Sequence, residues 1–135
     1  MSPLISHQIL NFASYMLVAA MLLAAFVWVY EKVTPYRDFS LIDENNNAVA
    51  IAMGGAIIGF TLPLVSAIYY TLSLLEMVTW AGITGVVQLT VYIVLRRCLG
   101  NKLSKAIEQG HTAWSILLAA LAISAGLLNA VCISH

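Results

Sequence analysis

The basic residues of this chain are confined to two short segments, and each segment lies between long apolar runs. Two of the six Lys and Arg residues lie in residues 31–47 and the other four in residues 96–111. Each apolar run has about 20 residues, the length that an α-helix needs to cross the hydrocarbon core of a bilayer. Basic residues accumulate in the cytoplasmic loops of membrane proteins. The pattern therefore predicts four membrane-spanning helices, with both basic segments in the cytoplasm and both termini outside.

The composition excludes an ordinary soluble domain. Only 9% of the 135 residues are charged and 61% are hydrophobic, whereas charged residues approach a quarter of a soluble chain. Four spans leave room for two modest loops, so the fold class is an all-α polytopic membrane protein with a single four-helix domain over residues 1–135. The spans are predicted at Ile9–Tyr30, Ala48–Tyr70, Leu74–Leu95 and Thr112–Ile133.

Aromatic residues collect near the ends of the predicted spans, where they are typical of a membrane interface. The inner set is Trp28, Tyr30 and Trp114, and the outer set is Tyr69, Tyr70 and Trp80. The two cysteines, Cys98 and Cys132, are predicted at opposite faces of the membrane. They therefore cannot form a disulfide within one subunit, and a bond between subunits through Cys132 stays open.

The two halves of the chain match each other at an offset of 65 residues without a gap. Lys32 aligns with Arg97, and the Ile42-Asp43 pair aligns with Ile107-Glu108. Apolar helices match each other by chance, but these matches in the loops are harder to explain that way. We expect a tandem repeat with units 1–65 and 66–135. Each unit holds two spans, so the repeat is parallel and its pseudo-twofold axis runs along the membrane normal.

Small residues form a stripe on the second and on the fourth predicted span. The second span carries Ala48, Ala52, Gly55, Gly59 and Pro63, and the fourth carries Ser115, Ala119, Ala122, Gly126 and Asn129. Small side chains let membrane helices approach closely and gain dispersion energy. The stripes pack either on each other within a subunit or between subunits. Pro63 removes one backbone hydrogen bond and is expected to bend its helix.

Four polar residues are candidates for a site within the membrane. Gln88 is predicted about 10 Å from the cytoplasmic edge, at the height of Gly54 and Gly55, where it serves as an interhelical hydrogen-bond donor or lines a pore. Asn11, Glu76 and Asn129 project to the outer edge. Glu76 is either an interfacial carboxylate that reaches water or a functional group that attracts cations.

No motif in the chain indicates catalysis. The sequence has no Ser/His/Asp set, no metal-ligand spacing of His or Cys, no Gly-rich phosphate loop and no basic patch suited to nucleic acid. We therefore expect that the protein is not an enzyme, holds no metal or cofactor and does not bind nucleic acid.

An ordered set of motifs resembles one known family. The set comprises Thr34-Pro35-Tyr36, Asn45-Asn46-Asn47-Ala48, Gly55-Ala-Ile-Ile-Gly59-Phe60, Gln88-Leu89 and Gly126-Leu-Leu-Asn-Ala-Val-Cys132. It is similar to the YjfL-like bacterial inner-membrane proteins, and it covers nearly the whole chain. Val131 and Ile133 depart conservatively from the closing motif of the family. The resemblance implies an inner-membrane location, four spans per unit, an envelope-associated role and a soluble cytoplasmic partner. It implies no substrate and no catalytic residue.

Two classes of function fit these observations. In the first, several copies assemble into a pathway for an ion or small solute, with Gln88, Glu76 and Asn129 lining or gating it. In the second, a non-conducting scaffold or accessory subunit in an envelope-stress system recruits a cytoplasmic protein. The residues of its recruiting loop would be Pro35, Tyr36, Arg37, Asn46 and Asn47. Both classes have the lipid bilayer as their surroundings and a homo-oligomer as their expected state.

Overall fold

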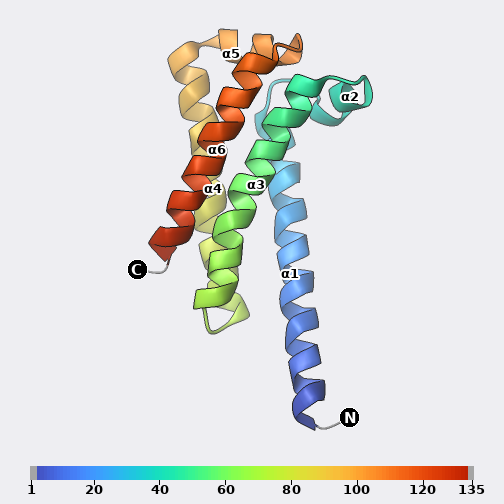
Figure 1. Cartoon of the computed structure of the whole chain (residues 1–135), viewed down its shortest axis with the longest axis vertical. Coiled ribbons are helices and arrows are strands. Elements are labelled where there is room, and N and C mark those ends of the chain that lie inside the picture. The colour runs from blue at the N-terminus through green and yellow to red at the C-terminus, as the bar shows by residue number, and fades with distance from the viewer. Residues whose placement is uncertain (1–2, 134–135) are drawn as a thin grey trace.

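A computed structural model describes residues 3–133, and these residues form helices and short connections with no strand (Figure 1). The helices are α1 (Pro3–Val33), α2 (Asp38–Asp43), α3 (Asn47–Tyr70), α4 (Leu74–Leu99), α5 (Asn101–Glu108) and α6 (Thr112–Ile133). Four of them, α1, α3, α4 and α6, are long and apolar enough to cross a membrane. The described chain is therefore the all-α polytopic membrane protein that the sequence predicts.

The observed helix boundaries differ from the predicted ones mainly at α1 and in the loops. The first helix begins at Pro3 rather than Ile9, because a proline in the first turn lacks only an N–H group that would be unpaired there anyway. The two predicted loops contain the short helices α2 and α5. In α5 the buried side chains are Leu103, Ser104, Ala106 and Ile107. Its lysines are exposed, so this helix lies with one apolar face on the bundle.

The closest helix pair is α3 with α6, and glycine makes this approach possible. A Cβ atom at Gly55 would collide with Ala119, and one at Gly126 would collide with the backbone of Gly59. At Gly59 the added atom would also lie 2.8 Å from Oε1 of Gln88. The two predicted small-residue stripes thus meet inside one subunit, where backbone contacts backbone.

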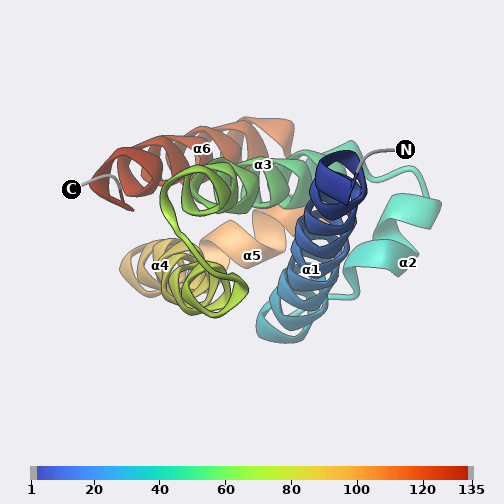
Figure 2. The same ribbon diagram turned by 90° about the horizontal axis from the view of Figure 1, so that it is seen from below.

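The other long helices pack unequally around this pair. Helix α4 contacts both α3 and α6, whereas α1 contacts α3 and α4. Viewed from below, α3 and α6 lie side by side, and the N-terminal part of α1 stands apart from α6 (Figure 2). Only Phe26 and Tyr30 of α1 are buried. We define the loop end as the end of the bundle that carries α2 and α5.

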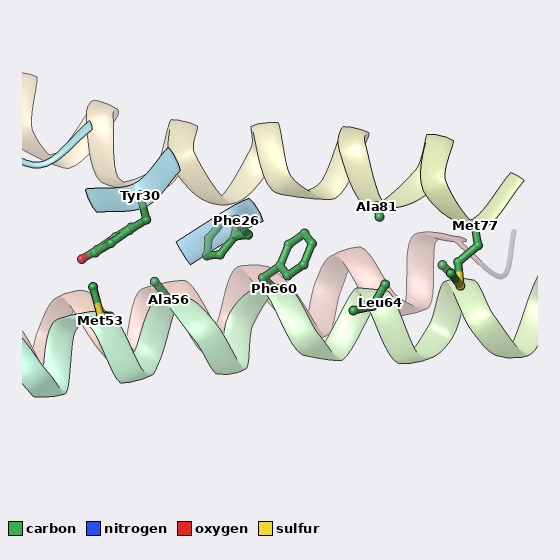
Figure 3. Packing of buried hydrophobic residues seen from close by; sticks show 9 residues of the cluster. Phe26, Tyr30, Met53, Ala56, Phe60, Leu64, Met77 and Ala81 are labelled. Carbon is green, nitrogen blue, oxygen red and sulfur yellow. The ribbon is translucent and has the colours of Figure 1, made fainter. Parts of the chain in front are cut away.

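An apolar core fills the space between α1, α3 and α4 (Figure 3). The rings of Phe26 and Phe60 stack with centroids 4.5 Å apart and an angle of 4° between their planes. Leu64, Met77 and Ala81 extend this core away from the loop end. Pro63 lies buried within α3, which continues past it to Tyr70.

One aromatic prediction is wrong. Tyr30 was expected in the interfacial belt, but only 3% of it is exposed. Its hydroxyl group points from the apolar core toward the loop end (Figure 3). Trp28 and Trp114 match the interfacial role better, because Lys32 and Lys102 each place Nζ 5.5 Å from the centroid of one of these rings.

Candidate functional site

The structure gathers buried polar side chains at the loop end, which we call the loop-end cluster. Its members come from α1, the connection after it, α2, α4 and α5, and every one of them is buried. They are Tyr30, Thr34, Tyr36, Asp38, Tyr92 and Ser104. Buried polar groups are expensive in a membrane protein unless they are paired, so such a cluster marks a site with a role.

The segment after α1 brings Asp38 inside. The Thr34-Pro35 step ends the helix, because the residue before a proline is displaced from the helical region. The chain then reverses, and Asp38 becomes the first residue of α2. Its exposed fraction is 0%. The hydroxyl of Thr34 donates to Oδ1 of Asp38 at 2.7 Å, which holds the carboxyl group beneath the last turn of α1.

Three tyrosines lie near this carboxyl group, and each of their phenols interacts electrostatically with it. The rings of Tyr30 and Tyr92 meet edge-on, with centroids 6.0 Å apart. The phenol of Tyr36 interacts electrostatically with both of them and with Asp38. Tyr92 Oη and Ser104 Oγ lie 3.2 Å apart and share a hydrogen bond. The three phenols link α1, α4 and α5 around Asp38.

Burial changes the acidity of the groups outside the spans. It raises the pKa of Asp38 from 3.8 to about 6, against the hydrogen bond from Thr34, which lowers it. The nearby Glu31 raises the pKa of Asp38 further. Burial also raises the pKa of the Tyr36 phenol, so this group stays protonated. Near neutral pH the site therefore holds one carboxylate and no second ionised acid inside it.

Gln88 continues the polar groups toward the middle of the bundle. Its Nε2 donates to the carbonyl oxygen of Gly59 at 3.0 Å. This carbonyl lies four residues before Pro63, which has no N–H group to donate to it. The sequence predicts an interhelical hydrogen bond from Gln88 at the height of Gly54 or Gly55. In the structure the acceptor is Gly59, about one turn further along α3.

The other atom of the Gln88 amide faces a small cavity. Oε1 of Gln88 is buried without a hydrogen-bond partner. Tyr30, Tyr92 and Gln88 line a cavity of about 10 Å³ together with apolar residues of α3 and α6. This volume suits about one water molecule. Polar groups thus extend from Asp38 through the tyrosines to Gln88, and beyond Gln88 the core is apolar.

The three polar residues predicted at the outer edge do not form a common site in the structure. Glu76 is exposed and caps its own helix: Oε2 accepts from the Leu72 backbone N–H at 3.2 Å, while Ser73 Oγ accepts from the Glu76 N–H at 3.2 Å. Asn11 lines an open groove beside Ile68. Nδ2 of Asn129 is buried without a hydrogen-bond partner.

The predicted recruiting loop divides into inward and outward residues. Tyr36 is only 6% exposed, so it is not on a surface that a partner could contact. Asn46 caps α3, because its Oδ1 accepts from the Val49 N–H at 3.2 Å, and its Nδ2 donates to the Glu108 carbonyl at 2.9 Å. Pro35, Arg37 and Asn47 are exposed.

Sequence reasoning missed the centre of this site. Asp38 stands in a charged loop, where an acidic residue is normally solvated, and Tyr92 and Ser104 carry no motif. One signal was present: the 65-residue offset aligns Asp38 with Leu103, an apolar residue inside a polar segment. Among residues 3–133 no group of three or more His, Cys, Asp or Glu side chains could hold a metal ion.

The fold and these features define a four-span, all-α membrane protein with a buried polar cluster at one end. A family model described as Domain of Unknown Function (DUF350) matches residues 4–133. The chain belongs to this family, which includes the YjfL-like proteins.

Two relatives match over nearly their full lengths. The UPF0719 inner membrane protein YjfL of Escherichia coli (strain K12) is 31% identical over 130 residues, which are 96% of this chain and 98% of that protein. The UPF0719 transmembrane protein YshE of Bacillus subtilis (strain 168) is 33% identical over 129 residues, 94% of each chain. No solved structure matches the chain.

Proposed function

We propose that this chain is an oligomeric bacterial inner-membrane protein that provides a permeation pathway for a small cation, and that the loop-end cluster attracts the cation. The observation that carries the proposal is Asp38, a fully buried carboxyl group with no basic partner. A buried carboxyl group without a basic partner is costly, and such a group marks a candidate functional site.

One subunit does not contain a complete path. Between α3 and α4, the half of the bundle beyond Gln88 is filled by Leu64, Ala67, Met77 and Ala81. Gly59 and Gly126 close the contact between α3 and α6. Conduction would therefore need a passage between subunits, with the exposed Glu76 near the end opposite the loop end. The native mass in lipid nanodiscs tests this: a ring of four or more copies is expected, and a monomer would contradict the proposal.

Orientation follows from the charge distribution. All six Lys and Arg residues belong to the two segments at the loop end, so we place the loop end in the cytoplasm and both termini in the periplasm. The name of the Escherichia coli relative supports an inner-membrane location. Cys98 is exposed at the end of α4. A membrane-impermeant thiol reagent should label Cys98 of a Cys132→Ser variant only after the cells are permeabilised, and labelling of intact cells would reverse the orientation.

Cation flux into proteoliposomes tests the function itself. The wild-type chain should conduct sodium or potassium above the level of empty vesicles. Asp38→Asn should reduce the flux to that level, since it removes the only buried charged side chain among residues 3–133. Glu76→Gln should lower the flux while retaining an oxygen that can cap α4. Asp43→Asn is the matched control, because Asp43 is an exposed acid on the same short helix as Asp38. Unchanged flux in Asp38→Asn would contradict the proposal.

The second candidate is a non-conducting scaffold that recruits a cytoplasmic protein. One observation favours it: the Phe39 side chain is 51% exposed on α2, next to the exposed Arg37. An aromatic and a basic residue together are typical of protein interfaces. Partner capture that is lost in Arg37→Ala and Phe39→Ala but retained in Asp38→Asn, without any flux, would support the scaffold instead.

A further inference from the structure

The pocket around Asp38 contains more hydrogen-bond acceptors than donors. The Thr34 hydroxyl oxygen lies 2.7 Å from Asp38 Oδ1, 3.1 Å from the Glu31 carbonyl oxygen and 3.3 Å from the Tyr36 carbonyl oxygen. A hydroxyl group has one hydrogen to donate, and the shortest contact takes it to the carboxylate. The two carbonyl oxygens are left facing the same hydroxyl oxygen without receiving a hydrogen from it.

One further polar atom of the pocket is unpartnered. Oδ2 of Asp38 is buried without a hydrogen bond. Asp38 is 0% exposed, so bulk water does not satisfy this oxygen. Unpaired polar atoms at this degree of burial are rare in folded proteins and indicate a missing partner.

The charges around Asp38 favour a positive partner. The carboxylate lies next to the carbonyl end of α1, which carries partial negative charge. Glu31 adds to the negative potential, and Tyr30, Tyr36 and Tyr92 supply neutral phenols. Arg96 interacts electrostatically with Tyr92, and no basic group is among the causes of the Asp38 pKa shift. Within residues 3–133 no ion pair joins Asp38 to Lys or Arg.

We propose that this pocket, between the end of α1 and the start of α2, binds one monovalent alkali cation through the oxygens of Asp38, Thr34, Glu31 and Tyr36. The ligands are the Asp38 carboxylate, the Thr34 hydroxyl and the carbonyl groups of the other two residues. Hard cations take oxygen ligands of these kinds. A single carboxylate among neutral oxygens balances one positive charge, which selects a monovalent ion over calcium or magnesium.

The second half of the chain shows that a carboxylate is not required for packing here. The residue 65 positions after Asp38 is Leu103, which is also buried, at 2% exposure, near the start of a short helix at the loop end. A leucine fills that place without a charge. The first half therefore holds a buried acid where an apolar residue would serve the fold, as expected of a binding group.

This inference rests on the same cluster as the proposed permeation function and names the class of cation. Its test is thermal unfolding of the purified full chain in nanodiscs at pH 7.5, with sodium or potassium chloride replacing choline chloride at constant ionic strength. We expect the Tm to rise by about 3–8 °C between 1 and 200 mM of the alkali cation, as for a ligand that binds only the folded state. A Tm that does not depend on the identity of the cation would overturn the inference.

Variants assign the effect to the pocket. Asp38→Asn should abolish the Tm response and Asp43→Asn should retain it. Thr34→Val removes one neutral ligand and should shift the midpoint of the Tm response to a higher cation concentration. This variant tests the site if Asp38→Asn does not fold. A full response in both Asp38→Asn and Thr34→Val would place the cation elsewhere and overturn the inference.

The flux assay separates the two proposals. A specific Tm response without flux would support the site and contradict permeation. Flux without a specific Tm response would support permeation and contradict the site.

Discussion

The two halves of the molecule, residues 3–70 and 74–133, share a frame and differ in what they place inside it. Helix α2 ends at Asp43 and α5 ends at Glu108, while α3 begins at Asn47 and α6 begins at Thr112. Both pairs are 65 residues apart. In each half, the connection between these two helices contains a residue with a positive φ angle. The two residues occupy equivalent positions: Asn45, with φ 69°, and Gly110, with φ 87°.

The backbone hydrogen bonds of the two connections are the same. Asn45 N–H donates to the Ile42 carbonyl and Asn46 N–H to the Leu41 carbonyl, each at 2.9 Å. At the equivalent positions of the second half, Gly110 N–H donates to Ile107 at 3.0 Å and His111 N–H to Ala106 at 2.9 Å. Equal turns at an equal offset support our inference that the chain is a tandem repeat with units 1–65 and 66–135.

The halves differ in polarity and in packing. The buried residue near the start of the short helix is Asp38 in α2 of the first half and Leu103 in α5 of the second half. The first long helix, α1, leaves most of its N-terminal half exposed, whereas α4 contacts both α3 and α6. We infer that the shared frame supplies stability, and that the buried carboxyl group of Asp38 is a feature of the first half that the frame does not need.

The contact between the halves should give the largest effect. Gly126→Leu would push a side chain into the backbone of Gly59, so we expect a loss of more than about 4 kcal/mol of stability or a failure to fold. Gly82→Ala is the control, because the space around Gly82 is open, and it should change stability by less than about 1 kcal/mol. Thermal unfolding in nanodiscs measures both, and a Gly126→Leu protein with the wild-type Tm would contradict the packing.

Exchanging the buried residues of the short helices tests the comparison directly. Leu103→Asp would bury a carboxylate without the Thr34 hydroxyl beside it, and we expect a loss of about 3–5 kcal/mol. Asp38→Leu should leave stability within about 1 kcal/mol of wild type or raise it, since apolar replacement of a buried charge is often neutral or stabilising.

The two variants should therefore move the Tm unequally in a single unfolding series. Equal losses in both would mean that Asp38 serves packing and that the halves do not differ in the way described. Phe39→Asp, an exposed change on α2, should have little effect and controls for added charge.

The acidity of Asp38 predicts how stability depends on pH. Its folded-state pKa is raised to about 6 from 3.8, so between these values the folded chain holds a proton that the unfolded chain has released. Stability should be greatest below about pH 4 and fall as the pH rises to about 6. In choline buffer we expect the Tm to drop by about 2–6 °C over this range. Asp38→Asn should remove the drop, and a Tm that rises with pH in the wild type would contradict the assignment.

A smaller effect concerns Pro63 and Gln88, whose equivalents in the other half are Leu128 and Leu23. Gln88→Leu leaves the Gly59 carbonyl without a donor and should cost about 1 kcal/mol. Pro63→Leu restores a backbone N–H that can donate to the same carbonyl. In that background Gln88→Leu should cost less, and a double-mutant cycle measures the difference. Additive losses would show that the proline and the amide are independent.

The four spans and many of their boundaries could be predicted from the sequence alone. The predicted and observed limits agree at Tyr70, Leu74 and Thr112–Ile133, because hydropathy, basic flanks and caps such as Asn46 act within a few residues of each boundary. The small-residue stripes and the amide of Gln88 were also visible as candidates for helix contacts. These features are local, so they can be recognised in short stretches of the sequence.

Which polar groups are buried together could not be predicted from the sequence and follows from how the helices pack. Asp38 looks like a solvated loop residue until α2 folds beneath the last turn of α1, and Tyr30 looks interfacial until α3 and α4 enclose it. Glu76 looks like an interfacial carboxylate in the sequence, and the structure shows that it also caps its own helix. The polarity around a side chain depends on which distant elements meet there, and hydropathy along the chain does not contain that information.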